Sequence, residues 1–453
     1  MNNNLFDEFD SVSSKQWKQK IQFDLKGADY NNTLIWKTNE DIDVKPFYHA
    51  DDFDKRPNIS NTKATQWKIC QSIFVADIKK SNLKAIDIIE RGADSIKFII
   101  HSDDISIKNL IEHINLEKTI LFFELQFLSE GYVKQILKLV PDAKIHLDII
   151  GQLSKTGNWF KSLNDDFKSF ECIIKNTNSF SVNGSLYQNA GANMVQQLAY
   201  ALAHTNEYLN VLEKSENNLQ KLDVIFNVSV GTNYFFEIAK LRALRKLWKV
   251  LASEFKVNTN CHIMVTPTKR NKTLYDYNTN MLRTTTECMS TILGGANTIM
   301  NLPYDSIYHK SNEFGERIAR NQLLVLKHES YFDKVNNPSD GAYYIESITN
   351  QLSEKALEVF KDIESNGGFL SQLKAGTVQR KIKESASAEQ QQFDNGEEVL
   401  LGSNKHPNTN DKMKNELELY PFVKTNSRKT LIEPIIEKRL SEQLEQKRLK
   451  DEN

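Results

Sequence analysis

Acidic, basic and hydroxyl side chains follow several short apolar runs in this sequence. The acid–base candidates are His101, Glu124, Asp148 and Asp305, since each lies at or near the C-terminal end of such a run. If the runs are strands of one parallel barrel, their C-terminal ends share a face, where these side chains would form a general acid–base site. The other candidates at equivalent positions are Ser72, Asn183, Asn227 and Thr266. The alternative, which we favour, is that all of them are solvated residues on the rim of the barrel.

The short apolar runs predict β-strands. They cover residues 67–74, 95–100, 119–125, 145–150, 179–183, 223–230, 261–265 and 298–302, and longer amphipathic stretches separate them. Continuous apolar strands that alternate with helices indicate a parallel sheet buried on both faces. Eight such units favour an α/β fold, namely a TIM-type eight-stranded parallel barrel. Residues 171–175 are a further strand candidate, which leaves the count open by one.

One amphipathic stretch, residues 237–251, predicts a helix in detail. Its apolar residues that recur at steps of three or four are Ile238, Leu241, Leu244, Trp248 and Leu251. This spacing predicts a single apolar stripe against the barrel, and it places the lysines and arginines of the same stretch on a solvated face.

The two ends of the chain differ from the middle. Residues 1–50 contain no convincing β/α unit, and their apolar residues are spread among polar ones: Trp17, Leu25, Leu34, Ile35, Trp36 and Phe47. They predict an N-terminal arm that packs on its own barrel or on a partner. Residues 51–382 are predicted as the barrel, and residues 383–453 as a polar linker followed by a C-terminal helix.

The composition of the chain argues against several classes of protein. Lys plus Arg number 58 and Asp plus Glu 59, so the charge balance gives no support to nucleic acid or an anionic membrane as a partner. No run approaches the roughly 18 apolar residues of a membrane span. The chain begins with the acidic stretch MNNNLFDEFD, which lacks a signal-peptide core, and its four cysteines have no metal or redox spacing. We therefore expect a cytoplasmic protein with reduced thiols.

Two patterns concern the interior of the predicted barrel. No arginine occurs between Arg91 and Arg242, although a barrel that binds a carboxylate or CoA phosphates usually needs a guanidinium group. The nine histidines are spread singly, without metal-binding spacing. His146, on a predicted strand, is expected to be a satisfied core residue rather than a metal ligand.

Several motifs, in order along the chain, resemble the methylmalonyl-CoA mutase family. EIAKLRALRKLW (237–248) is very similar to a barrel-helix signature of that family. Further matches are LKGADY with LIWKTNEDIDVKPFY (25–48), NMLRTTTECMSTILGGANTIMNLPYD (280–305), ERIARNQLLVLKHES (316–330), NNPSDGAYYIESIT (336–349), IESNGGF (363–369) and GEEVLLGSNKHP (396–407). The resemblance covers roughly residues 15–440 and is weakest between about 75 and 165.

The resemblance implies catalytic groups that this sequence lacks. Catalytic chains of the family use adenosylcobalamin to start a radical rearrangement inside the barrel, with a tyrosine, a carboxylate-binding arginine and a histidine at the site. By the matching runs Trp67–Gln71 and Gly184–Ala192, Ser72 stands at the tyrosine position and Leu186 at the histidine position. The arginine would fall in the arginine-free span. The Asp-x-His-x-x-Gly signature of the family's cobalamin-binding domain does not occur.

These departures predict a chain similar to the small, non-catalytic chain of heterodimeric mutases. We expect it to have no catalytic, cofactor-binding or metal-binding residues of its own and no cobalamin-binding domain. A large catalytic chain would bind adenosylcobalamin and interconvert methylmalonyl-CoA and succinyl-CoA, and this chain would stabilise the heterodimer. The alternative is an independent TIM-barrel enzyme, or an acyl-CoA-binding protein, that uses Glu124, Asp148 or His101.

Overall fold

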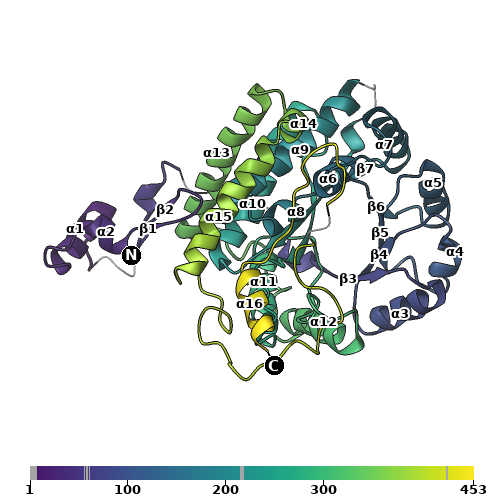
Figure 1. Cartoon of the computed structure of the whole chain (residues 1–453). Coiled ribbons are helices and arrows are strands. Elements are labelled where there is room, and N and C mark those ends of the chain that lie inside the picture. The colour runs from purple at the N-terminus through teal and green to yellow at the C-terminus, as the bar shows by residue number, and fades with distance from the viewer. Residues whose placement is uncertain are drawn as a thin grey trace.

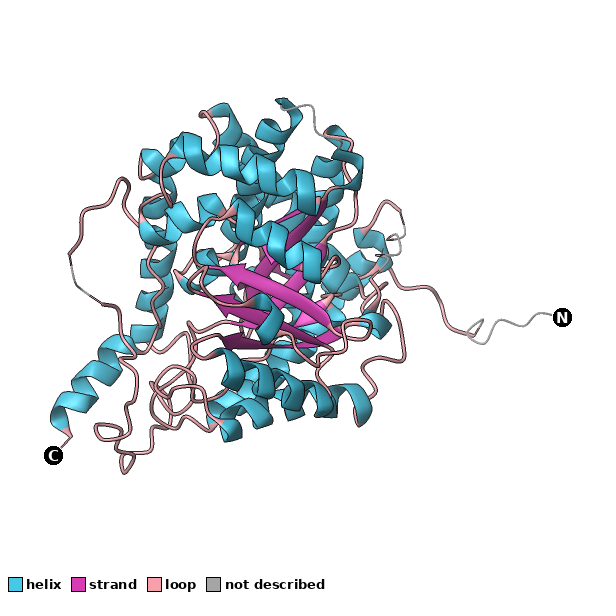
Figure 2. Ribbon diagram, turned by 90° about the vertical axis from the view of Figure 1, so that its right-hand side faces the viewer, coloured by secondary structure: helices cyan, strands magenta, loops and turns pink. Residues whose placement is uncertain are grey.

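A parallel β-barrel forms the centre of the molecule. The computed structural model describes residues 8–55, 57, 60, 62–214, 219–424 and 427–452. Figure 2 shows the strands at the core with helices around them. The strands are β3 (Lys68–Phe74), β4 (Ser95–Ile100), β5 (Ile120–Leu125), β6 (Lys144–His146), β7 (Ser179–Asn183), β8 (Asp223–Val230), β9 (His262–Pro267) and β10 (Thr298–Ile299). They pair in parallel in the order β6-β5-β4-β3-β10-β9-β8-β7, which confirms the predicted TIM-type fold.

Strands β6 and β7 lie at the two ends of this order and meet at a seam. In the described part of the chain, one main-chain hydrogen bond crosses the seam, from Ser181 N to Leu147 O at 3.1 Å. Asn183 N also donates to Oδ2 of Asp148 at 2.7 Å. The barrel is therefore nearly closed, and its weakest junction is this one.

Most strand predictions coincide with the structure, and three do not. Strand β10 ends at Ile299, three residues before its predicted end. Strand β6 is shorter than predicted, because Asp148 caps helix α6 (Ile149–Thr156) directly after it. The ninth strand candidate is wrong, since residues 171–175 lie in helix α7 (Leu163–Thr177), with Ile173 and Ile174 buried. A short apolar run alone does not distinguish a strand from one buried turn of a helix.

Helices cover the outside of the barrel (Figure 1). Besides α6 and α7, the helices along the barrel are α3 (Ile78–Glu90), α4 (Ile107–Leu110), α5 (Glu130–Leu139), α8 (Ser185–Asn189), α9 (Met194–Lys214), α10 (Tyr234–Glu254), α11 (Thr279–Leu293), α12 (Glu313–His328), α13 (Tyr343–Ser365) and α14 (Phe369–Lys374). The first turns of α3, α5 and α7 are capped by Asp77, Ser129 and Ser162, and each cap accepts a hydrogen bond from a backbone N–H.

Helix α10 is the helix predicted from residues 237–251, and its apolar stripe is buried as expected. The solvated basic face is wrong at two positions. Lys240 is buried and its Nζ lies 2.6 Å from Glu237, while buried Arg242 lies 2.6 Å from Glu346 of α13. Helix α13 packs over this face, so the cations are paired inside a layered shell rather than solvated.

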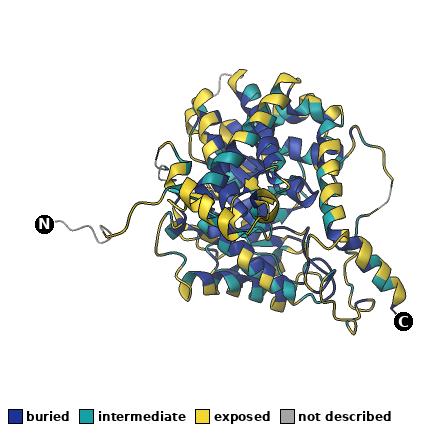
Figure 3. Cartoon of the chain, turned by 90° about the vertical axis from the view of Figure 1, so that its left-hand side faces the viewer, coloured by how far each residue is buried: buried dark blue, intermediate teal, exposed yellow. Residues whose placement is uncertain are grey.

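The arm projects from the barrel at the left of Figure 1. Its elements are α1 (Ser14–Asp24), α2 (Tyr30–Leu34) and the antiparallel pair β1 (Trp36–Lys37) and β2 (Asp43–Val44). Helix α1 has no buried residue, and Trp17 and Trp36 are 49% and 50% exposed. Figure 3, viewed from the side on which the arm projects, shows exposed ribbon in front of the buried core.

The root of the arm is fixed to the rest of the chain. Ile42 is buried in the main core. The side chains of Asn39 and Gln392 exchange hydrogen bonds of 2.8 and 3.0 Å, and Lys355 pairs with Asp41 at 2.9 Å. The arm is therefore anchored at its root, while α1 lies away from the barrel.

The C-terminal tail packs over the loops that follow the strands. Helix α15 (Thr377–Asp394) contains residues 382 and 383, where the sequence analysis divides the chain; that division stays a prediction. Beyond it, Ile435 N donates to Ser154 O at 2.8 Å, and Leu440 N donates to Arg270 O at 2.9 Å. Helix α16 (Glu442–Asp451) ends the tail. None of the helices in the described ranges has the length and apolar content needed to cross a bilayer.

Candidate functional site

The four acid–base candidates lie at the C-terminal side of the strands, but each has its own partner. Glu124 Oε2 lies 2.8 Å from Nζ of Lys97, and that cation lowers the pKa of Glu124 to about 2. His101 stacks on Phe74 with ring centroids 5.4 Å apart. Within the described residues, no hydrogen bond or ion pair joins His101, Glu124, Asp148 and Asp305 to one another. The structure does not assemble them into one constellation.

Asp148 belongs to a buried network that joins α6, β7 and α9. Its Oδ1 accepts a hydrogen bond from the Tyr208 hydroxyl at 2.7 Å and lies 2.9 Å from Nε2 of His204. Burial raises the pKa of Asp148, but contacts with His204 and Tyr208 outweigh burial, and the pKa lies below its ordinary value. His204 Nδ1 is 2.9 Å from the hydroxyl of buried Tyr187. The network is closed to solvent and holds three elements together.

The other rim candidates are dispersed. Asp305 is buried and accepts from Asn312 at 2.7 Å, with His309 Nδ1 at 3.1 Å. Ser72 lines a cavity of about 50 Å³, room for little more than water. The remaining candidates are half-buried: Asn183 ends β7 and Thr266 is the next-to-last residue of β9, whereas Asn227 lies inside β8 and not at its end as predicted.

Apolar side chains fill the axis of the barrel. Cys70, Phe122 and Met264, from three different strands, form a buried cluster distinct from the main core, and Ile120 and Met300 pack against it. We call these five residues the axial plug. The sequence analysis missed the plug, although the alternation of each strand contains the signal once the inward-facing positions are known.

Two histidines lie beside the plug. The rings of His146 and His262 contact Phe122, with centroids 5.4 and 5.7 Å from it. Burial lowers the pKa of His146 to about 3 and that of His262 to about 4, so both are neutral imidazoles. His146 is a core residue as expected, but its Nε2 has no hydrogen-bond partner. Among the described residues, no three His, Cys, Asp or Glu side chains gather to hold a metal ion.

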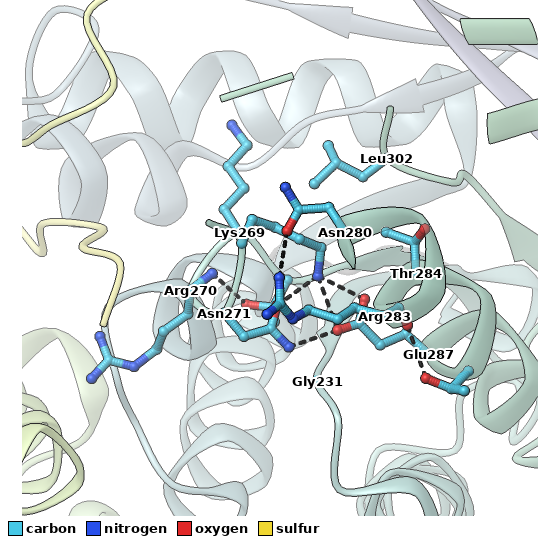
Figure 4. A network of polar contacts seen from close by, with 12 residues as sticks. Gly231, Lys269, Arg270, Asn271, Asn280, Arg283, Thr284, Glu287 and Leu302 are labelled. Carbon is cyan, nitrogen blue, oxygen red and sulfur yellow. Dashed lines mark hydrogen bonds and ion pairs between the residues drawn. The ribbon is translucent and has the colours of Figure 1, made fainter. Parts of the chain in front are cut away.

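A second buried polar network follows β9 (Figure 4). Lys272 Nζ lies 2.8 Å from Glu287 of α11, and Asn271 donates to the same carboxylate at 2.7 Å. Burial lowers the pKa of Lys272 and raises that of Glu287. Arg283 donates to the tail at Leu401 O, at 2.6 Å. The network fixes the β9 loop and the tail, and both charged partners are inaccessible.

The residues at the family's tyrosine and histidine positions lie on different elements. Ser72 lies on β3, and Leu186 lies on α8, directly after β7, where it is buried. A leucine side chain neither donates nor accepts a hydrogen bond, and a serine hydroxyl has no aromatic face.

Comparisons with known proteins bear on this barrel. The sequence family described as methylmalonyl-CoA mutase matches residues 143–451, about two-thirds of the chain. The chain belongs to the methylmalonyl-CoA mutase family. It is 33% identical over 441 residues to the methylmalonyl-CoA mutase small subunit of Porphyromonas gingivalis, covering 89% of this chain and 71% of that protein.

Two full mutases are more distant relatives. Those of Rhizobium meliloti and Cereibacter sphaeroides are 27% and 29% identical, over 86% of this chain and 64% of their own length. The chain therefore spans less than two-thirds of these two mutases. A solved dihydropteroate synthase from Anaplasma phagocytophilum aligns over 57% of this chain and 99% of its own, with 13% identity and a TM-score of 0.34, too low to bear on function.

Proposed function

We propose that this chain is the small, catalytically silent subunit of an adenosylcobalamin-dependent methylmalonyl-CoA mutase. A large catalytic chain would interconvert methylmalonyl-CoA and succinyl-CoA, and this chain would stabilise the heterodimer in the cytoplasm. The observation that carries the proposal is the pair of residues at the family's tyrosine and histidine positions, Ser72 and the buried Leu186.

The axial plug supports catalytic silence independently. A barrel that acts on an acyl-CoA needs an open interior to hold the substrate away from water. Here Cys70, Phe122 and Met264 close the axis, and each is at least 97% buried. Packing of this kind stabilises a barrel and occupies space that an acyl-CoA would need.

The residues at the site do not fit a corrinoid. Leu186 offers no hydrogen bond to a cofactor. Two histidines of the interior lie beside the plug, where His146 is buried and His262 is half-buried. We therefore assign no step of the reaction to this chain and place the cofactor in the partner. Purified alone, the chain should bind no adenosylcobalamin in a spectroscopic titration, and stoichiometric binding would contradict the proposal.

The arm supports a partner. Helix α1 exposes its apolar residues while the root of the arm is packed on the barrel, so the exposed part needs another surface to bury it. Aromatic side chains such as Trp17 and Phe23 are enriched at the centres of interfaces. Obligate interfaces commonly bury about 2,000 Å² or more.

The test is co-purification with a catalytic mutase chain. Deleting residues 1–28 removes α1 but keeps the root that includes Ile42, so the barrel should unfold at nearly its original temperature. Association should weaken and dissociation should accelerate. If the truncated chain stays associated at nanomolar concentration with an unchanged dissociation rate, the arm is not an interface element. If the full chain does not associate at all, the proposed function is wrong.

A further inference from the structure

A stretch of the tail without helix or strand, residues 428–440, runs beside α6 and α8 (Figure 1). We call it the strap. Near its first end, Leu431 N donates a hydrogen bond to Gly157 O at 3.0 Å, and further along Ile435 N donates to Ser154 O at 2.8 Å. Ser154 lies in α6 and Gly157 is the C-terminal cap of that helix, which directly follows β6. This part of the strap is therefore bound to the structure that follows β6.

The other end of the strap is bound to the elements that follow β7 and β9. Lys438 N donates to Asn189 O at 3.0 Å, and Asn189 is the last residue of α8, which follows β7. Leu440 N donates to Arg270 O at 2.9 Å, while Nη1 of Arg270 donates to Lys438 O at 2.8 Å. The strap thus connects α6, on one side of the seam between β6 and β7, with α8 and the β9 loop on the other side.

The strap approaches α6 as closely as a glycine permits. A Cβ atom at Gly157 would lie 2.6 Å from Ile432 O, well inside van der Waals contact. Gly157 also has a φ of +77°, a conformation that favours glycine. Ile432 and Ile435 of the strap are 9% and 4% exposed and belong to the main core. The strap is therefore packed on the barrel as part of that core.

We infer that the strap holds the barrel closed at the seam. In the described part of the chain, strands β6 and β7 share one main-chain hydrogen bond, from Ser181 N to Leu147 O. Because α6 follows β6 and α8 follows β7, parting these strands moves the two helices apart. The bonds of the strap to both helices cannot then all persist, so the seam opens only when at least one end of the strap is released. The inference concerns this chain alone and does not depend on the proposed partner.

The first test compares alanine at two glycines of the same backbone conformation. Gly157 and Gly376 have φ values of +77° and +75°, so both substitutions add similar backbone strain. Only Gly157→Ala places a methyl group against the strap, because a Cβ at Gly376 meets no atom within 4 Å outside its immediate neighbours. Hydrogen exchange at the Ser181 amide should accelerate at least about tenfold in Gly157→Ala and stay near the wild-type rate in Gly376→Ala.

A second pair of variants tests the other end of the strap. Lys438→Pro removes the N–H that donates to Asn189, whereas Ile436→Pro removes an N–H that makes no hydrogen bond in the described part of the chain. Circular dichroism checks that both variants fold. Lys438→Pro should accelerate exchange at Ser181 as Gly157→Ala does, and Ile436→Pro should not.

The wild-type chain offers a measurement that needs no substitution. After correction for intrinsic rates, the faster of the Ile435 and Lys438 amides should exchange at least as fast as the Ser181 amide, because the seam cannot open under an intact strap. Denaturant should promote exchange at Ser181 less than exchange in β4, as a local opening requires. Faster exchange at Ser181 than at both strap amides would overturn the inference. Exchange at Ser181 that follows global unfolding would also overturn it, as would an unchanged rate there in Gly157→Ala and Lys438→Pro.

Discussion

The two halves of the barrel share one parallel sheet but are covered differently. Strands β3–β6 lie beside short helices, with 13 residues in α3, 4 in α4, 10 in α5 and 8 in α6. Strands β7–β10 lie beside long ones, with 21 residues each in α9 and α10, 15 in α11 and 16 in α12. Helix α13, with 23 residues, adds an outer layer over α9 and α10.

The halves also differ in where their polar groups lie. In the first half, Lys97, Glu124 and His146 point toward the axis from adjacent strands. In the second half, Lys272 and Glu287 lie under the tail, outside the strands. The difference teaches that a thick helical shell can bury charged pairs outside the strands, whereas the half with the thinner shell keeps its charged pair on the inner side of the strands.

The largest effect should come from breaking the buried pair in the second half. Lys272→Met leaves Glu287 buried without its cation, which should lower the free energy of unfolding by about 3–5 kcal/mol. Chemical denaturation of the variant and the wild type measures the loss. The double variant Lys272→Met/Glu287→Leu should recover most of it, and a single variant as stable as the wild type would contradict the comparison.

A smaller, pH-dependent effect should come from the axis of the first half. His146 has a folded-state pKa of about 3 against 6.5 when unfolded, so the unfolded chain binds more protons between these values. Stability should therefore fall as the pH drops below 6.5, by about 2.5 kcal/mol between pH 7 and pH 4.5 for this residue. Denaturation at pH 7 and pH 4.5 tests this, since His146→Met should lose less stability on acidification. Equal losses would show that His146 does not titrate as described.

The ion pair at the rim should matter less. Glu124 is 39% exposed on its side chain, so solvent screens its contact with Lys97, and Glu124→Gln should cost under about 1 kcal/mol at pH 7. The pKa of Glu124 is lowered, so its contribution is present above the ordinary carboxyl pKa and is lost as the pH falls toward 2. Denaturation across that range measures it, and a loss of several kcal/mol at pH 7 would mean the pair is far better shielded.

Restoring the family residues in both halves should have no effect on activity. Ser72→Tyr with Leu186→His leaves the axial plug closed and does not supply the carboxylate-binding arginine. An acyl-CoA isomerisation assay of the isolated double variant should therefore give no product above the wild type. Detectable turnover would show that the two substitutions alone had silenced the chain.

The fold could be predicted because each strand is a continuous apolar run with its own helix. Strands β4, β7 and β8 have the predicted bounds. The sequence could not decide whether residues 171–175 form a strand or a helix, because their apolar side chains suit both equally. The tail's path over the β9 loop depends on single hydrogen bonds such as Leu440 N to Arg270 O, which no local pattern encodes.

The candidate site was harder to predict than the fold. Burial of Lys240 and Arg242 depends on Glu237 and on Glu346, and the latter lies about a hundred residues away on α13. Asp148 looked like a rim acid because its partners, Tyr208 and His204, come from a later helix. A reactive carboxylate is distinguished from a structural one by the partners that distant parts of the chain supply, and not by its residue type.

The seam between β6 and β7 has a consequence for how the molecule opens. Each other pair of neighbouring strands has at least two residue pairs in register. Strands β6 and β7 are joined, among the described main-chain groups, by the single hydrogen bond from Ser181 N to Leu147 O. Local openings begin where the fewest bonds must break. We therefore expect thermal fluctuations to open the barrel first between β6 and β7. Amide protons next to this seam should exchange with solvent before those of β4 or β8.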